Sequence, residues 1–427
     1  MGMVTEAEYR RISPADFFYR NRDIAGFSNP TRAVYSAIRE FVENSLDACE
    51  AIQTPPEIYI RVTAKRPGPG TIPYSLLVYD NGCGVPSSKI PHCFGQVLFG
   101  SKYLLQQTRG TFGLGGTMAI LYGQITTNTP AKILSSTGGK WVYEYKLFIH
   151  IERNEPIVLD GYPKRFGNKD GWHGTVVEIC LTGDYPRAEP KVLEYLKRTA
   201  VTNPYATITL ADPKGRLYRF RRVTTRVPKP PSPTKPHPHG VDVETLNRLI
   251  GLATREGCND LLRFMTKYLH RVGKGTASRF LKVVGLPPDT DLRTLSPSDV
   301  VRLAEAMNRF DRFLPPKADC LSPLGAQLLR IGIEKELHPE FIATFNRRPS
   351  TYSGHPFIVE GAIAYGGNFP PGITLYRYAN KIPLVYDEAS DVSWKVVREL
   401  INWGRYRVRQ DAPVAVITHI CSTKIPY

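Results

Sequence analysis

The sequence predicts a mixed α/β protein with about three domains. Helical and strand-like segments alternate over 27–227 and again over 313–427, whereas 240–312 shows helical periodicity alone. The segment 228–239, which joins the first α/β region to the helical region, contains six prolines in twelve residues. A proline-rich stretch of this kind is stiff and marks a domain boundary. We therefore expect two α/β domains separated by a linker and a small all-helical domain.

The first α/β region, 27–227, has the pattern of a sandwich with helices on one face of a mixed sheet. It follows an N-terminal arm, 1–26, which carries a short helical segment from Pro14 to Tyr19. The strands that we expect in this region are Ile58–Thr63, Tyr74–Tyr79, Trp141–Ile151, Thr175–Leu181 and Ala206–Leu210.

A long amphipathic helix begins at Asn29-Pro30, where asparagine suits the cap and proline suits the first turn. Its polar face carries Glu40, Asn44 and Asp47. A carboxylate at Glu40 could accept a proton from water beside a phosphate, and the amide oxygen of Asn44 suits magnesium. Alternatively, this face is only solvated. The opposite face repeats with helical period at Val34, Ile38, Phe41, Val42, Ser45, Leu46 and Cys49, broken only by the small serine.

A second motif lies where the strand-like run 74–79 ends at Asp80, which Gly82 and Gly84 follow. The two glycines allow the backbone to turn tightly beneath the carboxylate. A carboxylate buried there needs a hydrogen-bonding partner, and the exocyclic amine of adenine is a natural one. The alternative is a plain Asn-Gly hairpin turn.

A glycine-rich segment follows at 110–116, with four glycines in seven residues, and leads into the apolar run Met118 to Tyr122. This pattern is typical of a loop that opens onto a helix N-terminus, where unpaired N–H groups bind phosphate. It is not a P-loop, because no Gly-Lys-Ser/Thr follows. The three motifs in this order predict a pocket for the base, the metal ion and the phosphates of a nucleotide.

The helical region contains a glycine turn at 272–277, followed by a helix from Ala277 to Val284. The N–H groups of the turn, with Arg271 and Lys274 beside it, would suit a phosphate of a nucleic acid backbone. Alternatively, the region is a helical insert that only packs between domains. The helix before the turn is indicated by apolar residues at helical spacing, Leu261, Leu262, Met265, Tyr268 and Leu269.

The last region, 313–427, returns to an α/β pattern. We expect buried strands at Phe357–Ala364 and Val414–Cys421, and a helix at Val392–Trp403. Four residues of that helix are expected to face inward: Val396, Val397, Leu400 and Ile401.

The composition favours a polyanionic partner. The net charge is +17 with a pI near 9.5, and because no basic amphipathic helix stands out, nucleic acid fits better than an anionic membrane. Seven scattered cysteines without a CxxC pair argue for a reducing compartment and against a zinc site. No apolar run approaches the ~18 residues of a membrane span. We expect a cytoplasmic, nucleoid-associated protein with no membrane contact.

The ordered motifs ExxxN, DxGxG and GxxGxG resemble the ATPase superfamily that includes gyrase B subunits, MutL, heat-shock chaperones of the ninety-kilodalton class and histidine kinases. Within it, the chain is similar to the family of B subunits of DNA topoisomerase VI. The similarity rests on stretches spread over nearly the whole chain: Ser13-Pro14-Ala15-Asp16-Phe17-Phe18, Phe99-Gly100-Ser101-Lys102-Tyr103, Gln107-Thr108-Arg109-Gly110, His173-Gly174-Thr175, Gly354-His355-Pro356-Phe357-Ile358-Val359-Glu360, Tyr378-Ala379-Asn380-Lys381-Ile382-Pro383 and Cys421-Ser422-Thr423-Lys424-Ile425-Pro426-Tyr427.

The resemblance implies a role for each motif. Glu40 would be the general base for ATP hydrolysis, and Asn44 would be the ligand of Mg²⁺. Asp80 would contact adenine, with Gly84 lining the pocket and Thr175 helping to hold the base.

The resemblance also implies phosphate contacts and a switch. Lys424 would reach the terminal phosphate from another domain and act in catalysis, because a flexible ammonium distinguishes ATP from ADP. Residues that would cradle the phosphates or form the loop over them are Ser101, Lys102, Gly110, Phe112, Gly113, Leu114, Gly115 and Gly116.

At the level of the whole protein, the resemblance implies an ATPase domain at 27–227, a helix-two-turns-helix domain at 240–312, and a transducer domain of the ribosomal-S5 type at 313–427. The N-terminal arm would cross to a twin subunit. ATP-dependent homodimerisation would close a gate on duplex DNA. A separate A subunit, in an A2B2 heterotetramer, would cut both strands, and hydrolysis would reset the gate after DNA is relaxed or decatenated.

Two other functions compete with this one. The first is a nucleotide-gated DNA clamp or scaffold without a cleavage partner. It is favoured slightly because Gly116-Thr117 stand where relatives usually have Val-Lys, and because the long helix that grips the A subunit is expected to be missing beyond Tyr427. The second is a chaperone ATPase, against which the helical domain and the positive charge argue.

Overall fold

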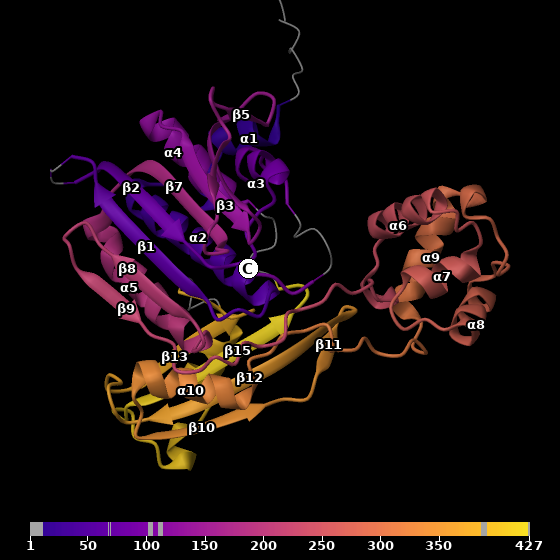
Figure 1. Cartoon of the computed structure of the whole chain (residues 1–427). Coiled ribbons are helices and arrows are strands. Elements are labelled where there is room, and N and C mark those ends of the chain that lie inside the picture. The colour runs from indigo at the N-terminus through magenta and orange to yellow at the C-terminus, as the bar shows by residue number, and fades with distance from the viewer. Residues whose placement is uncertain are drawn as a thin grey trace, which may run out of the picture. The chain divides into compact units, whose positions relative to one another are not determined.

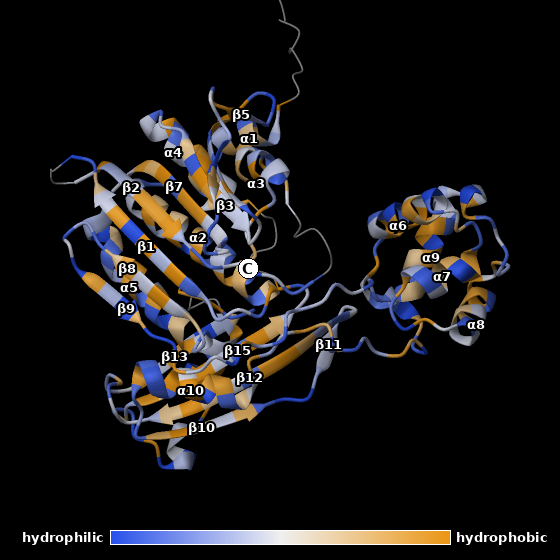
Figure 2. Ribbon diagram, in the orientation of Figure 1, coloured by the Kyte–Doolittle hydropathy of each residue, from blue (hydrophilic) through white to orange (hydrophobic). Residues whose placement is uncertain are grey.

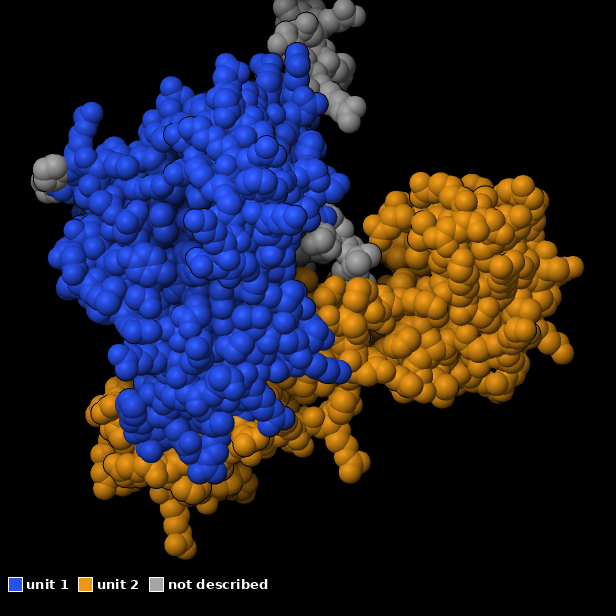
Figure 3. Space-filling model, in the orientation of Figure 1, with its two compact units in different colours: residues 1–103, 109–230, 328–339 blue, residues 104–108, 231–327, 340–427 orange. Residues whose placement is uncertain are grey.

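The computed structural model describes residues 12–66, 68, 70–100, 106–109, 114–385 and 391–425. The chain divides into two compact units (Figure 3). Each unit combines segments that are distant in sequence. Unit 1 consists of 1–103, 109–230 and 328–339, and unit 2 of 104–108, 231–327 and 340–427.

Unit 1 is built on one mixed sheet, which confirms the predicted α/β class (Figure 1). Its strands are β1 Glu57–Ala64, β2 Ile72–Tyr79, β3 Ala131–Thr137, β4 Trp141–His150, β5 Glu155–Val158, β6 Lys164–Gly167, β7 His173–Gly183, β8 Thr207–Ala211 and β9 Leu217–Phe220. Their order is β5-β4-β3-β7-β2-β1-β8-β9, with β6 paired to β4. Strands β1 and β8 are parallel, with Tyr59 opposite Thr209, and the other neighbouring strands are antiparallel.

The α-helices described in unit 1 are α1 Pro14–Arg20, α2 Pro30–Ala51, α3 Ile90–Gly95, α4 Gly115–Thr127 and α5 Tyr185–Thr202, together with most of α10 Gly325–Leu337. The long helix α2 begins as predicted, because Oδ1 of Asn29 accepts a hydrogen bond from the N–H of Arg32 at 2.8 Å and Pro30 occupies the first turn. The predicted short helix and all five predicted strands of this region are confirmed. Strands β3, β5, β6 and β9 had not been expected.

Helix α4 contacts both α2 and β7. It carries hydrophobic residues (Figure 2), and the run Met118–Tyr122 within it is buried. The close approach to β7 requires a glycine, because a Cβ on Gly123 would lie 2.5 Å from the carbonyl oxygen of Cys180. A second close contact involves helix α10, Gly325–Leu337, where a Cβ on Gly332 would overlap the carbonyl oxygen of Val201 at the end of α5.

The helical part of unit 2 comprises α6 Val243–Arg255, α7 Leu261–Tyr268, α8 Lys274–Val284 and α9 Pro297–Arg309. They enclose a hydrophobic core that includes Phe264, Met265, Phe280, Leu303 and Met307. The predicted pair of helices around the glycine turn is confirmed, although α8 begins at Lys274, three residues before the predicted start.

The remainder of unit 2 contains a second mixed sheet of β10 Phe341–Asn346, β11 Ser350–Tyr352, β12 His355–Tyr365, β13 Ile373–Ala379, β14 Ile382–Pro383 and β15 Val414–Ser422. The strand order is β10-β12-β15-β13-β14, with β11 paired to β12. Strands β13 and β15 are parallel, and the others are antiparallel. Both predicted strands are confirmed as β12 and β15.

The predicted helix at Val392–Trp403 is wrong in length and partly wrong in orientation. Helix α11 covers only Val392–Lys395 and continues as a wider π-turn at Val396–Leu400. Val397 is buried as expected, but Leu400 is 67% exposed and Val396 is 37% exposed. A π-turn has hydrogen bonds between residues five apart, so apolar residues that follow a 3.6-residue repeat no longer lie on one face of it.

Among the helices that the structure describes, none combines the length and the apolarity needed to cross a bilayer.

We expect Gly123→Ala to destabilise unit 1 by about 1–3 kcal/mol, because the backbone carbonyl opposite it cannot move aside as a side chain would. Denaturant unfolding monitored by circular dichroism measures this. Gly251→Ala, in α6, is the matched control, since nothing lies within 4 Å of its added Cβ and a helical glycine is replaced by a better helix former. Equal effects of the two substitutions would contradict the close-packing argument.

Candidate nucleotide-binding site

Two residues of α2, Glu40 and Asn44, lie against the N-terminus of α4. A Cβ on Gly115 would overlap the Glu40 carboxylate, and a Cβ on Gly116 would lie 3.2 Å from Nδ2 of Asn44. The absence of side chains at both positions therefore lets the first turn of α4 approach the polar face of α2. That turn carries N–H groups without intrahelical partners and the positive end of the helix dipole. A carboxylate, an amide and an anion-binding helix end thus meet at one place.

The two oxygens of Glu40 have different surroundings. Oε1 accepts a short hydrogen bond from the guanidinium of Arg39, whereas Oε2 is the atom nearest Gly115. Arg39 also lies 3.8 Å from Glu43. Burial by itself lowers the pKa of Arg39, but the neighbouring carboxylates of Glu40 and Glu43 outweigh it and raise that pKa. The guanidinium therefore stays charged and holds one side of the Glu40 carboxylate.

The residues Gly116-Thr117 begin α4 without placing a cation there. Oγ1 of Thr117 donates to the carbonyl oxygen of Leu114 at 2.9 Å, and the side chain is buried. This hydroxyl turns back onto its own helix. Any contact of this helix end with an anion consequently comes from backbone N–H groups.

Asp80 lies directly after β2 and is buried, as predicted. Its Oδ1 accepts hydrogen bonds from the N–H groups of Gly82, at 2.9 Å, and Thr175, at 3.1 Å. Its Oδ2 accepts one from the hydroxyl of Ser45, at 3.0 Å. A carboxylate can accept about four hydrogen bonds, so Oδ2 retains capacity for one more donor.

Burial raises the pKa of Asp80 to about 6, and the hydrogen bonds from Gly82, Ser45 and Thr175 only partly offset this. A carboxyl with this pKa is mostly ionised at neutral pH and becomes protonated under mildly acidic conditions. The group is therefore sensitive to a new hydrogen-bond donor, which would favour its ionised form.

The backbone around Asp80 is packed too closely for side chains at two glycines. Gly84 has φ +66°, and a Cβ there would overlap the carbonyl of Ser136. Gly174 has φ +138°, and a Cβ there would overlap the carbonyl of Asp80 itself. The hydroxyl of Ser135 donates to the carbonyl of Gly174 at 2.8 Å, and its oxygen lies 3.1 Å from the hydroxyl oxygen of Thr175. Strands β2, β3 and β7 thus hold the Asp80 loop in a fixed shape.

The structure brings the predicted site residues of unit 1 into two groups joined by α2. One group is Glu40 and Asn44 with the start of α4; the other is Asp80 with Gly84 and Thr175. Asn44 and Ser45 are consecutive, and the first lies near Gly116 while the second bonds Asp80. Lys424 belongs to unit 2, is exposed, and donates its backbone N–H to Oγ of Ser422 at 3.3 Å. The predicted residues outside the described part of the chain are Ser101, Lys102, Gly110, Phe112 and Gly113.

Sequence reasoning missed a buried ion network beside this site. Arg109 pairs with Glu50 and, at 2.9 Å, with Asp47, and donates to Asn203 at 2.8 Å. Burial lowers the pKa of Arg109, but Glu50 and Asp47 more than compensate and raise it. Asp47 had been expected to share the exposed polar face of Glu40. The spacing of acidic residues along α2 gave no sign that a distant arginine would cover part of that face.

Comparison with known proteins identifies the family. A family model described as the transducer of the topoisomerase VI B subunit matches residues 316–427, and one described as a histidine kinase-, DNA gyrase B- and HSP90-like ATPase matches residues 29–147. The latter covers α2, Asp80 and the start of α4.

Two curated relatives match over the whole chain. The chain is 43% identical over 430 residues to the B subunit of type 2 DNA topoisomerase 6 from Metallosphaera sedula, a match that covers 100% of this chain and 80% of that protein. It is 45% identical over 422 residues to the protein of the same name from Pyrobaculum aerophilum, covering 98% and 78%.

The chain also resembles a solved structure, the 43K ATPase domain of Thermus thermophilus gyrase B in complex with an aminocoumarin. The match covers 97% of this chain and 81% of that one, with 12% sequence identity and a TM-score of 0.42, so the likeness is distant. The identity to the curated relatives is high and spans nearly the whole chain. The chain therefore belongs to the family of B subunits of type 2 DNA topoisomerase 6, whose members are ATPase subunits of ATP-dependent type IIB DNA topoisomerases.

Proposed function

We propose that the site of unit 1 binds ATP with its base at Asp80 and its phosphates at the N-terminus of α4. The observation that carries this proposal is the close contact between Gly115 and the Glu40 carboxylate, together with Asn44 at Gly116. A half-buried helix N-terminus, which suits an anion, beside a potential base is the arrangement that phosphate hydrolysis needs. The remaining acceptor capacity of Asp80 suits the exocyclic amine of adenine.

In this proposal Glu40 accepts the proton of the attacking water. Its Oε2 faces the start of α4, where the terminal phosphate would bind, and its Oε1 is held by Arg39. Arg39 therefore orients the carboxylate and stays protonated while Oε2 receives the proton. The N–H groups of α4 hold phosphate oxygens and stabilise the charge that develops on them.

We propose that Mg²⁺ accompanies the nucleotide and that Asn44 is its protein ligand. The fit is supported by the position of Asn44, which is exposed on α2 within reach of the same helix end as Glu40. A neutral amide oxygen suits Mg²⁺, which takes most of its other ligands from phosphate and water. When bound, the ion would neutralise phosphate charge. The role of this chain, through Asn44, would be to orient the ion.

We further propose that Lys424 senses the terminal phosphate, and that ATP binding drives two copies of the chain to dimerise around duplex DNA. The relatives are named as B subunits of a type 2 DNA topoisomerase, which supports DNA as the substrate and an A subunit as the cleaving partner. We place this activity at the nucleoid in the cytoplasm, where that substrate lies. A ligand can shift such a gate only by its different affinities for the open and closed states, and a mobile ammonium at the phosphate supplies one difference.

The helical part of unit 2 offers a surface suited to a DNA backbone. A cavity of about 880 Å³ lies between α8 and α9, and the cationic residues that line it outnumber the acidic ones, Glu305 and Asp311. These cationic residues are Arg279, Lys282, Arg302, Arg309 and Arg312. Beside the glycine turn, Arg271 donates to the carbonyl of Pro315 at 2.7 Å. Contacts of this kind would be independent of sequence and sensitive to salt.

Replacing Glu40 by glutamine tests the general base. The substitution keeps the size of the side chain and removes proton-accepting capacity, so we expect kcat for ATP hydrolysis to fall by about 10²–10⁴-fold. Binding of a non-hydrolysable ATP analogue, measured by calorimetry, should change little and serves as the control. Hydrolysis at the wild-type rate would exclude Glu40 from this role.

The raised pKa of Asp80 predicts a pH dependence of nucleotide binding. Since only the ionised carboxyl accepts fully from an amine, affinity for the ATP analogue should fall as the pH drops below about 6. Asp80→Asn should bind more weakly and lack this step, which separates the titration of Asp80 from that of the phosphates. The same inflection in both proteins would remove Asp80 from the adenine contact.

The proposed gate is tested by the mass of the purified chain in solution, with and without the ATP analogue and Mg²⁺. We expect a change from monomer to dimer on nucleotide addition. Lys424→Ala should bind the analogue but dimerise less and hydrolyse ATP more slowly, because the phosphate contact is lost. Nucleotide binding without any change in mass would instead favour a clamp or scaffold with no working gate.

A further inference from the structure

The turn between β13 and β14 is unusual because it is polar, left-handed and buried. Asn380 and Lys381 have φ values of 48° and 69°, and their exposed fractions are 5% and 2%. Turns normally lie at the surface, since buried polar groups must find partners. Here each backbone N–H has one: Asn380 donates to the carbonyl of Ile420 at 2.8 Å, and Lys381 donates to Nε2 of His419 at 2.9 Å.

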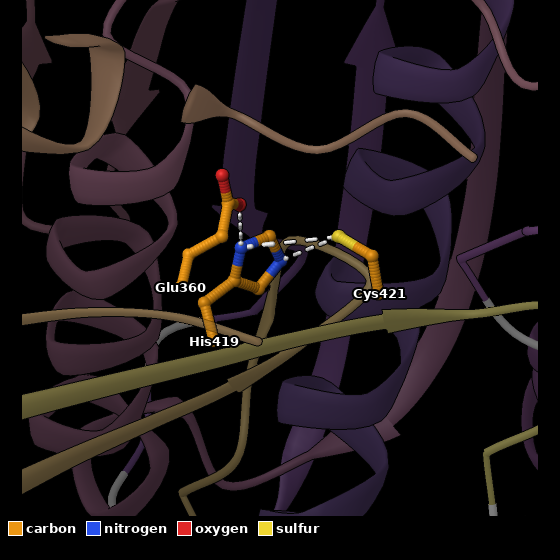
Figure 4. A group of neighbouring side chains, drawn as sticks. All are labelled: Glu360, His419 and Cys421. Atoms are coloured by element: carbon orange, nitrogen blue, oxygen red, sulfur yellow. Dashed lines mark hydrogen bonds and ion pairs between the residues drawn. The ribbon is translucent and has the colours of Figure 1, made fainter. Parts of the chain in front are cut away.

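Beneath this turn lies a buried cluster of Glu360, His419 and Cys421 (Figure 4). Their potential ligand atoms lie within 4.8 Å of one another, a spacing that could hold a metal ion. The hydrogen bonds argue against that use. Glu360 accepts from the N–H groups of Leu324 and Gly325 and from Nδ1 of His419, and Nε2 of His419 faces Lys381.

The cluster is therefore a hydrogen-bonded support for the turn. Burial raises the pKa of Glu360, but the hydrogen bonds from His419, Gly325 and Leu324 outweigh it and lower that pKa, so the carboxylate stays ionised. The ammonium of Lys381 donates to Oγ of Ser322 at 3.0 Å. With these contacts the backbone at 380–381 is held against β15.

The side chain of Asn380 forms hydrogen bonds with both the backbone N–H and the backbone carbonyl of one residue of β15, Ser422. Its Nδ2 donates to the carbonyl of Ser422 at 3.1 Å, and its Oδ1 accepts from the N–H of Ser422 at 3.0 Å. The same Nδ2 lies 3.2 Å from the carbonyl oxygen of Thr108. Only an amide offers a donor and an acceptor in this arrangement, and asparagine tolerates the left-handed backbone better than most residues.

Ser422 in turn fixes the start of the segment that carries Lys424. Oγ of Ser422 donates to the carbonyl of Pro356 at 2.9 Å and accepts the N–H of Lys424 at 3.3 Å. Oγ1 of Thr423 lies 3.1 Å from Nδ1 of His355. The strand therefore ends with its last residues bonded on both sides, and Lys424 leaves it in a defined direction.

We propose that Asn380 is a positioning residue for Lys424, which sets the path of residues 422–424 and so the direction in which the ammonium extends. This inference rests on the proposed role of Lys424 at the terminal phosphate. Asn380 itself would touch neither nucleotide nor metal. Its effect on hydrolysis should pass entirely through the lysine, and this separates it from a residue that merely stabilises the sheet.

The test is a double-mutant cycle in this chain assembled with its A subunit and DNA. Asn380→Gly removes the amide while glycine retains the left-handed backbone. We expect it to lower kcat for ATP hydrolysis by roughly five- to tenfold, with the affinity for the ATP analogue nearly unchanged. In a Lys424→Ala background the same substitution should lower kcat no further, because residues that act through one contact are not additive.

Two further variants keep the result interpretable. Asn308→Ala also removes an amide that donates to two carbonyls, those of Val241 and Ala304, but far from β15 in sequence, and should leave kcat at the wild-type value. Asn380→Asp keeps the acceptor for Ser422 and loses the donor, so it should fall between wild type and Asn380→Gly, and it serves in place of the glycine variant if that one does not fold.

The outcomes separate the inference from the proposal beneath it. A wild-type rate in Asn380→Gly, or an equal fold-loss with and without Lys424, would overturn the positioning role while leaving Lys424 as the switch. A wild-type rate in Lys424→Ala would overturn both. Loss of kcat only when Lys424 is present, with Asn308→Ala unaffected, would support the inference.

Discussion

The architecture of the nucleotide site depends on the contact between α2 and the first turn of α4. Helix α2 supplies Glu40, Asn44 and Ser45 within two turns, and the side chains of Glu40 and Asn44 lie against α4 because Gly115 and Gly116 have no side chains. The carboxylate then lies beside the positive end of a helix dipole, which stabilises it. An alanine at Gly115 would displace the Glu40 carboxylate from its place against α4, and so move the proposed general base away from the proposed phosphate site.

Around this contact, charged side chains are stabilised by ion pairs with one another. Arg39 holds Glu40, and the buried Arg109 is shared by Asp47, Glu50 and Asn203. Breaking such a buried network by removing one partner typically costs ~3–5 kcal/mol, because the remaining charge is left without compensation. The surroundings of the site are therefore held by ionic groups, of which Asp47 and Glu50 lie on α2 further along the helix than the proposed catalytic residues.

Much of unit 1 could be predicted from local pattern. The cap at Asn29, the apolar stripe of α2 and the five main strands follow from short-range sequence signals, and the glycines at 82 and 84 indicated a tight turn at Asp80 correctly. The errors have specific causes. Ser45 seemed to be a gap in an apolar stripe, but it bonds a carboxylate 35 residues away. At Val396–Leu400 a π-turn changed the periodicity that the prediction assumed. The buried partners of Asp47 and Asn380 depend on tertiary contacts that no spacing reveals.

The discontinuity of the two units has a consequence for how the chain is made. The parallel pairing of β1 with β8 joins residues about 150 positions apart, and unit 1 also includes 328–339, where Gly332 packs on the end of α5. During synthesis the helical segment 240–312 therefore leaves the ribosome before the first unit has all of its parts. Contacts this distant in sequence form slowly, because a long loop must close before they are gained. Unit 1 would therefore remain incompletely folded, with part of its core exposed to solvent, while the helical segment 240–312, whose contacts are mainly local, folds first.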